Sequence, residues 1–102
     1  MIIPSPANEA WDRFIHKGVT IDFESGLDDE GAAIFDIWSV NKRKGEAREA
    51  ILLLRKKYGW IHVEGVMEDS PIAISFWKKM LSDGVVDVAT QTNGISIQGK
   101  LE

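Results

Sequence analysis

The sequence predicts an α+β fold of α/β type with three layers: a mixed, mostly antiparallel sheet of about five strands, in which a crossover helix joins one parallel pair. Two observations support this prediction. Apolar and polar residues alternate at 19–24, and a polar turn connects this segment to a second strand-like segment at 32–40, which is typical of a β-hairpin. A helical period then covers 45–58 between two strand-like segments, and a strand, helix and strand in succession form a parallel pair.

The N-terminal segment predicts a helix. Ser5 is a suitable N-cap and Pro6 suits the first helical position, and Gly18 is the expected stop. The apolar stripe of this helix consists of Ala7, Ala10, Trp11, Phe14 and Ile15. The strand at 19–24 follows, with Val19, Ile21 and Phe23 on its buried face.

The second half predicts two more helices and further strands. Residues 45–58 form a helix that Gly59 ends, and 60–66 form a strand. Ser70 and Pro71 repeat the cap-plus-proline signal before a second apolar stripe, which ends at Gly84. The tail at 85–90 and 95–101, around an Asn-Gly pair, predicts a terminal hairpin. The 102 residues are expected to form a single domain, 1–102.

Composition excludes several classes of protein. The chain has no cysteine, so disulfides, thiolate catalysis and cysteine-based zinc sites are excluded, and with two histidines no metal site is expected. No segment of about 18 residues is apolar enough to span a membrane, so we expect no membrane partner. The N-terminus lacks the pattern of a secretory signal, which makes the cytoplasm the expected compartment.

The segment from Asn41 to Arg48 predicts a phosphate-binding loop. Seven of the twelve Lys and Arg residues lie between Lys42 and Lys57 in a chain of net charge −4, which indicates a local anion site and argues against a nucleic-acid surface. Gly45 and Ala47 leave room for an anion at the N-terminus of the helix, where free N–H groups attract phosphate. The alternative is a solvated basic turn.

Two stretches resemble the GNAT superfamily of N-acetyltransferases. The strand at 35–40 and the run Lys42-Arg43-Lys44-Gly45-Glu46-Ala47 are similar to its acetyl-CoA signature, a strand followed by Gln/Arg-x-x-Gly-x-Gly/Ala at a helix start, with Lys42 at the Gln/Arg position. The run from Ser70 to Met80 is similar to the second helix of the family, Asn-x-x-Ala-x-x-Phe-Tyr-x-x-Leu, and Ala73, Phe76 and Met80 fit that pattern. The resemblance covers Ala32 to about Val88.

The resemblance implies a GNAT-like fold and an N-acetyltransferase that uses acetyl-CoA as co-substrate and an amine as acceptor. It implies that the strand before the loop binds the pantetheine, that the loop binds the pyrophosphate, and that the second helix lies along the cofactor. The implied cofactor-binding residues are Trp38, Ser39, Val40, Lys42, Arg43, Lys44, Gly45, Glu46, Ala47, Arg48, Ser70, Phe76 and Trp77. Because the N-terminal part is short for the family, a homodimer would complete the acceptor pocket.

Asp36, His62 and Glu64 are the candidate catalytic bases. A neutral amine must attack the thioester, so a base that removes its proton is needed. Alternation places His62 and Glu64 on one face of their strand, and Asp36 would meet them if the two strands are parallel neighbours. The alternative is that all three are ordinary polar residues on a half-exposed sheet. Trp77 occupies the position of the tyrosine that serves the family as general acid.

Three functions are therefore open. The first is a minimal acetyl-CoA-dependent N-acetyltransferase. The second is a GNAT-like fold without catalysis, which acts as a CoA-binding or protein-interaction module. The third, a nucleic-acid binder that uses 42–57, conflicts with the acidic net charge and would show affinity that falls steeply with salt.

Overall fold

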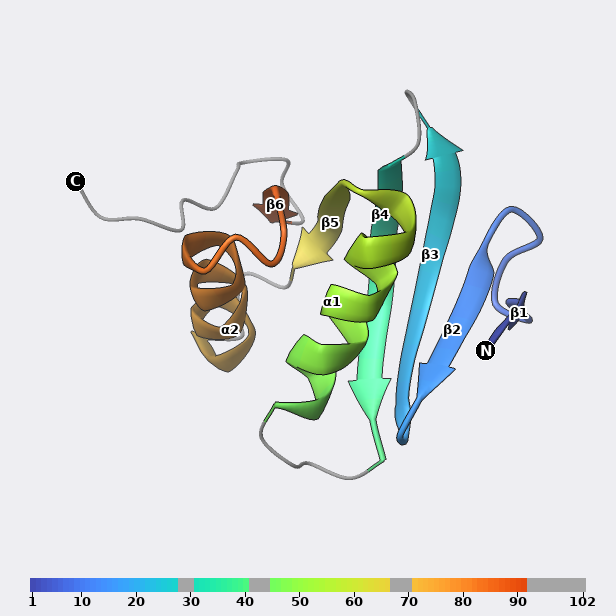
Figure 1. The fold of residues 1–102 in the computed structure, drawn as a ribbon, viewed down its shortest axis with the longest axis horizontal. Helices are drawn as coiled ribbons and strands as arrows, with labels where there is room; N and C mark the ends of the chain where they lie inside the picture. The colour runs from blue at the N-terminus through green and yellow to red at the C-terminus, as the bar shows by residue number, and fades with distance from the viewer. Residues whose placement is uncertain (28–30, 41–44, 67–70, 92–102) are drawn as a thin grey trace.

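A computed structural model of the chain describes residues 1–27, 31–40, 45–66 and 71–91 (Figure 1). Its strands and helices alternate in the second half of the chain, whereas the first half contains strands alone. The elements are β1 (Ile2–Pro4), β2 (Asp12–His16), β3 (Val19–Leu27), β4 (Gly31–Ser39), α1 (Glu46–Tyr58), β5 (Ile61–Val66), α2 (Pro71–Ser82) and β6 (Val88–Gln91).

All six described strands form one sheet in the order β1-β2-β3-β4-β5-β6. The pairs from β1 to β4 are antiparallel, and β4-β5 and β5-β6 are parallel. A helix lies between the strands of each parallel pair: α1 connects β4 to β5, and α2 connects β5 to β6. The predicted mixed sheet, its parallel pair and its crossover helix are thus confirmed, and a second parallel pair is added to them.

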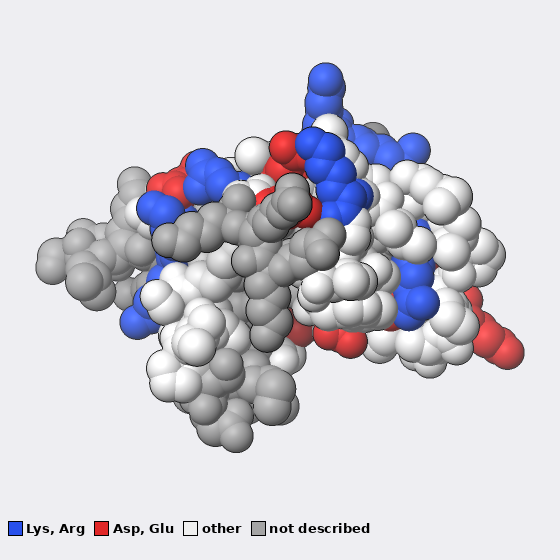
Figure 2. Space-filling view, turned by 90° about the horizontal axis from the view of Figure 1, so that it is seen from below, with Lys and Arg blue, Asp and Glu red and all other residues white. Residues whose placement is uncertain are grey.

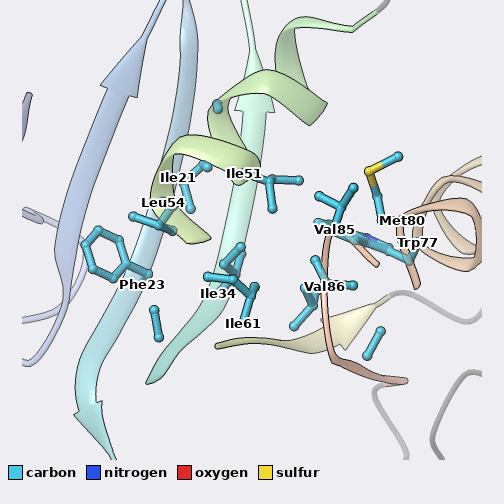
Figure 3. Packing of buried hydrophobic residues seen from close by; sticks show 14 of the residues in the cluster. Ile21, Phe23, Ile34, Ile51, Leu54, Ile61, Trp77, Met80, Val85 and Val86 are labelled. Atoms are coloured by element: carbon cyan, nitrogen blue, oxygen red, sulfur yellow. The ribbon is translucent and has the colours of Figure 1, made fainter. Parts of the chain in front are cut away.

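Both helices pack on the same face of the sheet. Figure 3 shows side chains of α1 and α2 meeting inward-facing side chains of the strands in one apolar cluster. Ile51 and Leu54 of α1 are as fully buried as Ile21 and Ile34 beneath them. The cluster also includes Phe23, Ile61, Trp77, Met80, Val85 and Val86. Burial of these apolar side chains is the main stabilising contribution to the fold.

Glycine and proline set the helix boundaries as the sequence predicts. Gly45 and Gly59 flank α1 with φ of 91° and 80°, left-handed conformations that glycine adopts without steric cost. Pro71 is the first residue of α2, where its missing N–H would have had no helical partner. None of the helices that the structure describes is long and apolar enough to cross a membrane.

Ion pairs fasten α1 to the sheet at both ends. His16 and Lys17, beside the β2-β3 turn, contact Glu49, and their hydrogen bonds, first that of His16, hold the pKa of Glu49 below its usual value. Arg55 binds Asp87, which also accepts a hydrogen bond of 2.9 Å from the Ile61 N–H. Burial raises the pKa of Asp87, but these hydrogen bonds outweigh it and the pKa lies below its usual value.

The predicted N-terminal helix is wrong. Its residues form a turn and β2, because local hydrogen bonds compete with the helix: the Ala7 N–H donates to Ser5 Oγ and the Ala10 N–H donates to Asn8 Oδ1. The expected stop, Gly18, is instead part of a two-residue turn between β2 and β3. Lys17 and Gly18 both have positive φ, 49° and 82°, which is the type I′ geometry that matches the twist of a hairpin.

Two further expectations are corrected. The sheet has six strands among the described residues, not about five, and both described helices cover one face, so this part of the chain has two layers and not three. Of the predicted terminal hairpin, the first half contains β6, which pairs in parallel with β5, while Val85 and Val86 enter the core. The second half of that hairpin, 95–101, lies outside the described residues.

Candidate functional site

The parallel strands β4 and β5 are paired only at their N-terminal ends. Ala32, Ala33 and Ile34 face Ile61, His62 and Val63, and beyond this point no register pair joins the two strands although both continue. A β-bulge lies at the same place on the other side of β4. There Asp22 and Phe23 of β3 face Asp36 and Ile34, so Phe35 is the extra residue. The strands therefore separate toward their C-terminal ends.

A pocket of about 170 Å³ occupies the wedge between the separated strands. Its lining comes from β4, β5 and α2: Ile34, Phe35, Asp36, Ile37, Val63, Glu64, Gly65, Ala73 and Trp77. Ile34, Ile37 and Val63 belong to the helix-covered face of the sheet, whereas Asp36 and Glu64 come from the opposite face. The pocket thus has an apolar side beneath the helices and an acidic side on the other face.

Both helices begin at the end of the sheet toward which this wedge opens. α1 starts at Glu46, soon after β4 ends at Ser39, and Figure 1 shows its first turn at the end to which the β4 arrow points. Gly45 precedes it with no side-chain cap on the helix N–H groups. Unpaired N–H groups and the helix dipole favour an anion at such an end, and ligands of open α/β sheets bind at the carboxyl ends of parallel strands.

The structure brings together two of the three candidate bases. Asp36 and Glu64 line the same pocket. His62 does not line it but lies on the same face of β5 as Glu64, with 3.9 Å between His62 Nε2 and Glu64 Oε1. The Nε2 atom of His62 is buried without a hydrogen-bond partner, and the ring packs edge-on against Trp60. A buried polar atom with no partner is uncommon and requires an explanation.

The predicted cofactor residues fall into two groups. Trp77 lines the pocket and is 5% exposed, and Phe76 packs edge-on against it at 4.8 Å and belongs to the core. At the end of β4, Trp38 and Val40 are exposed. Lys42, Arg43, Lys44 and Ser70 lie outside the described residues, so the loop itself stays a prediction.

In the first turn of α1, Arg48 is already bound to Asp83, which follows α2. Hydrogen bonds from Arg48 hold the pKa of Asp83 below its usual value. Figure 2, viewed from the end of the molecule where α1 begins, shows Lys and Arg side chains of the described residues intermixed with Asp and Glu. The basic segment is therefore partly neutralised within the protein.

The face of the sheet opposite the helices, which we call the open face, carries a polar and aromatic cluster that the sequence did not indicate. This cluster consists of Trp11, Arg13, Asp22, Phe35, Asp36 and Trp38. Asp22 is 1% exposed and accepts two hydrogen bonds from Arg13, at 2.8 and 3.0 Å. These bonds raise the pKa of Arg13 above its usual value. Residues 13–16 do not alternate strictly between polar and apolar, so they gave no strand signal, and the helix prediction for 7–15 hid the cluster.

The chain was compared with protein-family models, curated proteins and solved structures. No match was found. The separated strands, the pocket and the helix ends are therefore the observations on which a function must be argued. Among the described residues, no group of three or more His, Asp or Glu side chains could hold a metal ion.

Proposed function

We propose that this chain is an acetyl-CoA-dependent N-acetyltransferase that transfers the acetyl group to a primary amine by direct attack. The observation that carries the proposal is the wedge between β4 and β5, with its pocket and with the start of α1 at its open end. The GNAT-like reading of the sequence supports it at the same residues, since the pantetheine strand would be β4 and the pyrophosphate loop would precede α1.

The wedge suits a long, narrow substrate with amide groups. A strand without a neighbour offers backbone N–H and C=O groups along its edge, and an extended chain with amides can pair with them as a further strand would. The pocket, of about 170 Å³, has room for an acetyl thioester. Its apolar side, formed in part by Val63 and Trp77, would exclude water from the thioester.

The acidic side of the pocket provides the base. In direct transfer, the amine nitrogen bonds to the acetyl carbon, the carbon–sulfur bond breaks, the thiolate leaves with the electron pair, and one proton passes from the amine to a base. Glu64 and Asp36 both line the pocket, and one of them would receive that proton. The apolar side of the pocket, beneath the helices, would thus bind the acetyl thioester, and the acidic side, on the opposite face of the sheet, would bind the amine.

The thiolate has no phenol to protonate it in this pocket. Trp77 occupies the position of the family's tyrosine, and Tyr58, the only tyrosine in the chain, packs against Phe23 in the core at 5.4 Å. A thiol has a pKa of about 8.5, so a thiolate can leave without a general acid and take its proton from water afterwards. The Trp77→Phe variant should therefore retain turnover.

Thermal-shift titration with acetyl-CoA tests the proposal, because a ligand that binds the folded state stabilises it by mass action. Gly45→Glu should abolish the shift, since its bulk and charge would lie where the pyrophosphate approaches. Gly45→Ala is the matched control: at φ of 91° both variants strain the backbone by about 1–2 kcal/mol, but alanine adds neither bulk nor charge. An acetyl-CoA shift that persists in the glutamate variant would remove the cofactor assignment.

The alternative is a CoA-binding or protein-interaction module without catalysis. Trp77 in place of a titratable tyrosine and the absence of a described helix on the open face favour it. A shift with acetyl-CoA, combined with no release of thiol in the presence of a panel of primary amines, would select this alternative. Release of thiol that depends on an amine would select the enzyme.

A further inference from the structure

The acidic side of the pocket carries more negative charge than the protein neutralises. Arg13 is the one Lys or Arg in the described open-face cluster, and both of its hydrogen bonds go to Asp22. Among the described residues, no Lys or Arg forms an ion pair with Asp36 or with Glu64. Asp36 accepts one hydrogen bond, from the Ile37 N–H at 2.9 Å. Glu64 therefore has no Lys or Arg partner among the described residues, and Asp36 interacts with the charge of Arg13 only at longer range, without an ion pair.

Aromatic side chains lie beside these carboxylates. Trp11 and Phe35 stack at 4.8 Å with their rings nearly parallel, and Trp38 is 41% exposed. The Arg13 guanidinium lies 5.0 Å from the centre of the Trp38 ring, so the open face already binds one cation over an aromatic ring. Aromatic faces next to carboxylates form the usual receptor for organic ammonium groups. Charge complementarity thus identifies the occupant of the open face as a cation.

One ammonium group would not be sufficient. If both carboxylates held the reacting nitrogen, their charge would raise its pKa and keep it protonated, which opposes attack on the thioester. An acceptor with two ammonium groups removes this conflict, because one group can be anchored while the other reacts. Asp36, which is exposed and adjoins Phe35, suits the anchor. Glu64, with His62 Nε2 at 3.9 Å, suits the base.

We propose that the acceptor is an aliphatic diamine or longer polyamine, whose distal ammonium binds Asp36 at the aromatic open face while its reacting amine gives a proton to Glu64. The catalytic part of this inference rests on the proposed function; the binding part does not. Asp36 is then a specificity-determining residue, and Glu64 is the catalytic residue that receives the proton. The nitrogen–carbon bond forms as the carbon–sulfur bond breaks, and the thiolate takes the electron pair.

Equilibrium dialysis without acetyl-CoA tests the binding part. The probes are ¹⁴C-labelled 1,4-diaminobutane and n-butylamine, which share the four-carbon chain and differ by one ammonium group. The diamine should bind at least about tenfold more tightly, and Asp36→Asn should remove that advantage without changing the affinity for butylamine. Asp83→Asn, which removes a carboxylate on the helix side of the sheet, is the matched control and should have no effect.

The inference would be overturned if the two amines bound equally well, or if Asp83→Asn lowered the affinity for the diamine as much as Asp36→Asn does. The absence of diamine binding at 10 mM, roughly ten-thousandfold above a Kd of 1 μM, would also overturn it. Circular dichroism of each variant confirms that a loss of binding does not reflect unfolding.

Thiol release with both amines separates the two proposals. With the diamine, Asp36→Asn should raise KM at least about tenfold with kcat unchanged, which is the pattern of a lost anchor. Glu64→Gln should abolish turnover even at saturating diamine. If acetyl-CoA binds and butylamine reacts as well as the diamine, the inference fails and the enzyme remains. If no amine releases thiol while the diamine still binds, the proposed function fails and the cation site remains.

Discussion

Filling the pocket with a side chain of the protein should abolish acetyl-CoA binding while the fold survives. Ala73 lines the pocket from α2, and Ala73→Phe would project a benzene ring toward it. An apolar cavity of about 150 Å³ accepts benzene, and this pocket measures about 170 Å³, so the ring occupies most of it. Burial of the ring gains about 1.5–3 kcal/mol, and imperfect packing costs about 1–3 kcal/mol, so the two effects nearly cancel.

One thermal-shift experiment separates the effect of the substitution on stability from its effect on acetyl-CoA binding. The melting temperature of the variant without ligand should stay within about 10 °C of the wild type, since 1 kcal/mol corresponds to about 4–8 °C in a domain of this size. Acetyl-CoA at a hundred times its Kd should stabilise the wild type by about 2.7 kcal/mol, or roughly 10–20 °C, and should not shift the variant.

Ser75→Phe provides the control. Ser75 is exposed on the same helix and does not line the pocket, so this variant adds the same ring elsewhere and should retain the full shift. An undiminished acetyl-CoA shift in a folded Ala73→Phe protein would refute the assignment of the pocket to the thioester end of the cofactor. A variant that unfolds would be replaced by Ala73→Val, which takes less of the volume and should weaken the shift.

Two predictions concern the ion pairs that hold α1. The lowered pKa of Glu49 means that its contribution to stability is complete above the pKa of an unfolded glutamate, about 4.3, and is lost as pH falls through the lower, folded-state pKa. Urea unfolding should therefore find Glu49→Gln less stable than the wild type at pH 7 and equal to it at pH 2; a difference that persists at pH 2 would contradict the ion-pair explanation. Asp87→Ala removes hydrogen bonds to Arg55 and to a buried backbone N–H, and should reduce the free energy of unfolding by about 2–3 kcal/mol. If the free energy of unfolding falls by less than about 0.5 kcal/mol, water has replaced the hydrogen bonds of the carboxylate.

Most elements could be predicted because their signals are local. The helical period of α1 lies between two glycines, and α2 begins at Pro71, so boundaries and period agree within a few residues. The N-terminal helix failed because the same apolar spacing suits a turn followed by a strand. The choice between them depends on pairing with β3, from Phe14 to Ile21 for example, which no local pattern contains.

The site was predicted in part for a similar reason. Alternation correctly places His62 and Glu64 on one face of β5, and parallel pairing brings that strand beside β4. Unbroken alternation along β4 would place Asp36 on the same face as the buried Ile34. The bulge at Phe35 reverses this and moves Asp36 to the open face. A bulge depends on the register between strands, so it could not be read from the residues of β4 alone.

The short pairing between β4 and β5 also separates the sheet into two parts that can open independently. Three register pairs join the antiparallel part, β1 to β4, to the parallel part that contains β5 and β6, and α1 adds two ion pairs, Arg55–Asp87 and Arg48–Asp83. Such a narrow seam allows one part to open before the whole protein unfolds. Backbone amides of β5 and β6 should then exchange with deuterium sooner than those of β3. A ligand in the wedge would contact both parts and slow that exchange. The exchange rates of the β5 and β6 amides would therefore report whether the site is occupied.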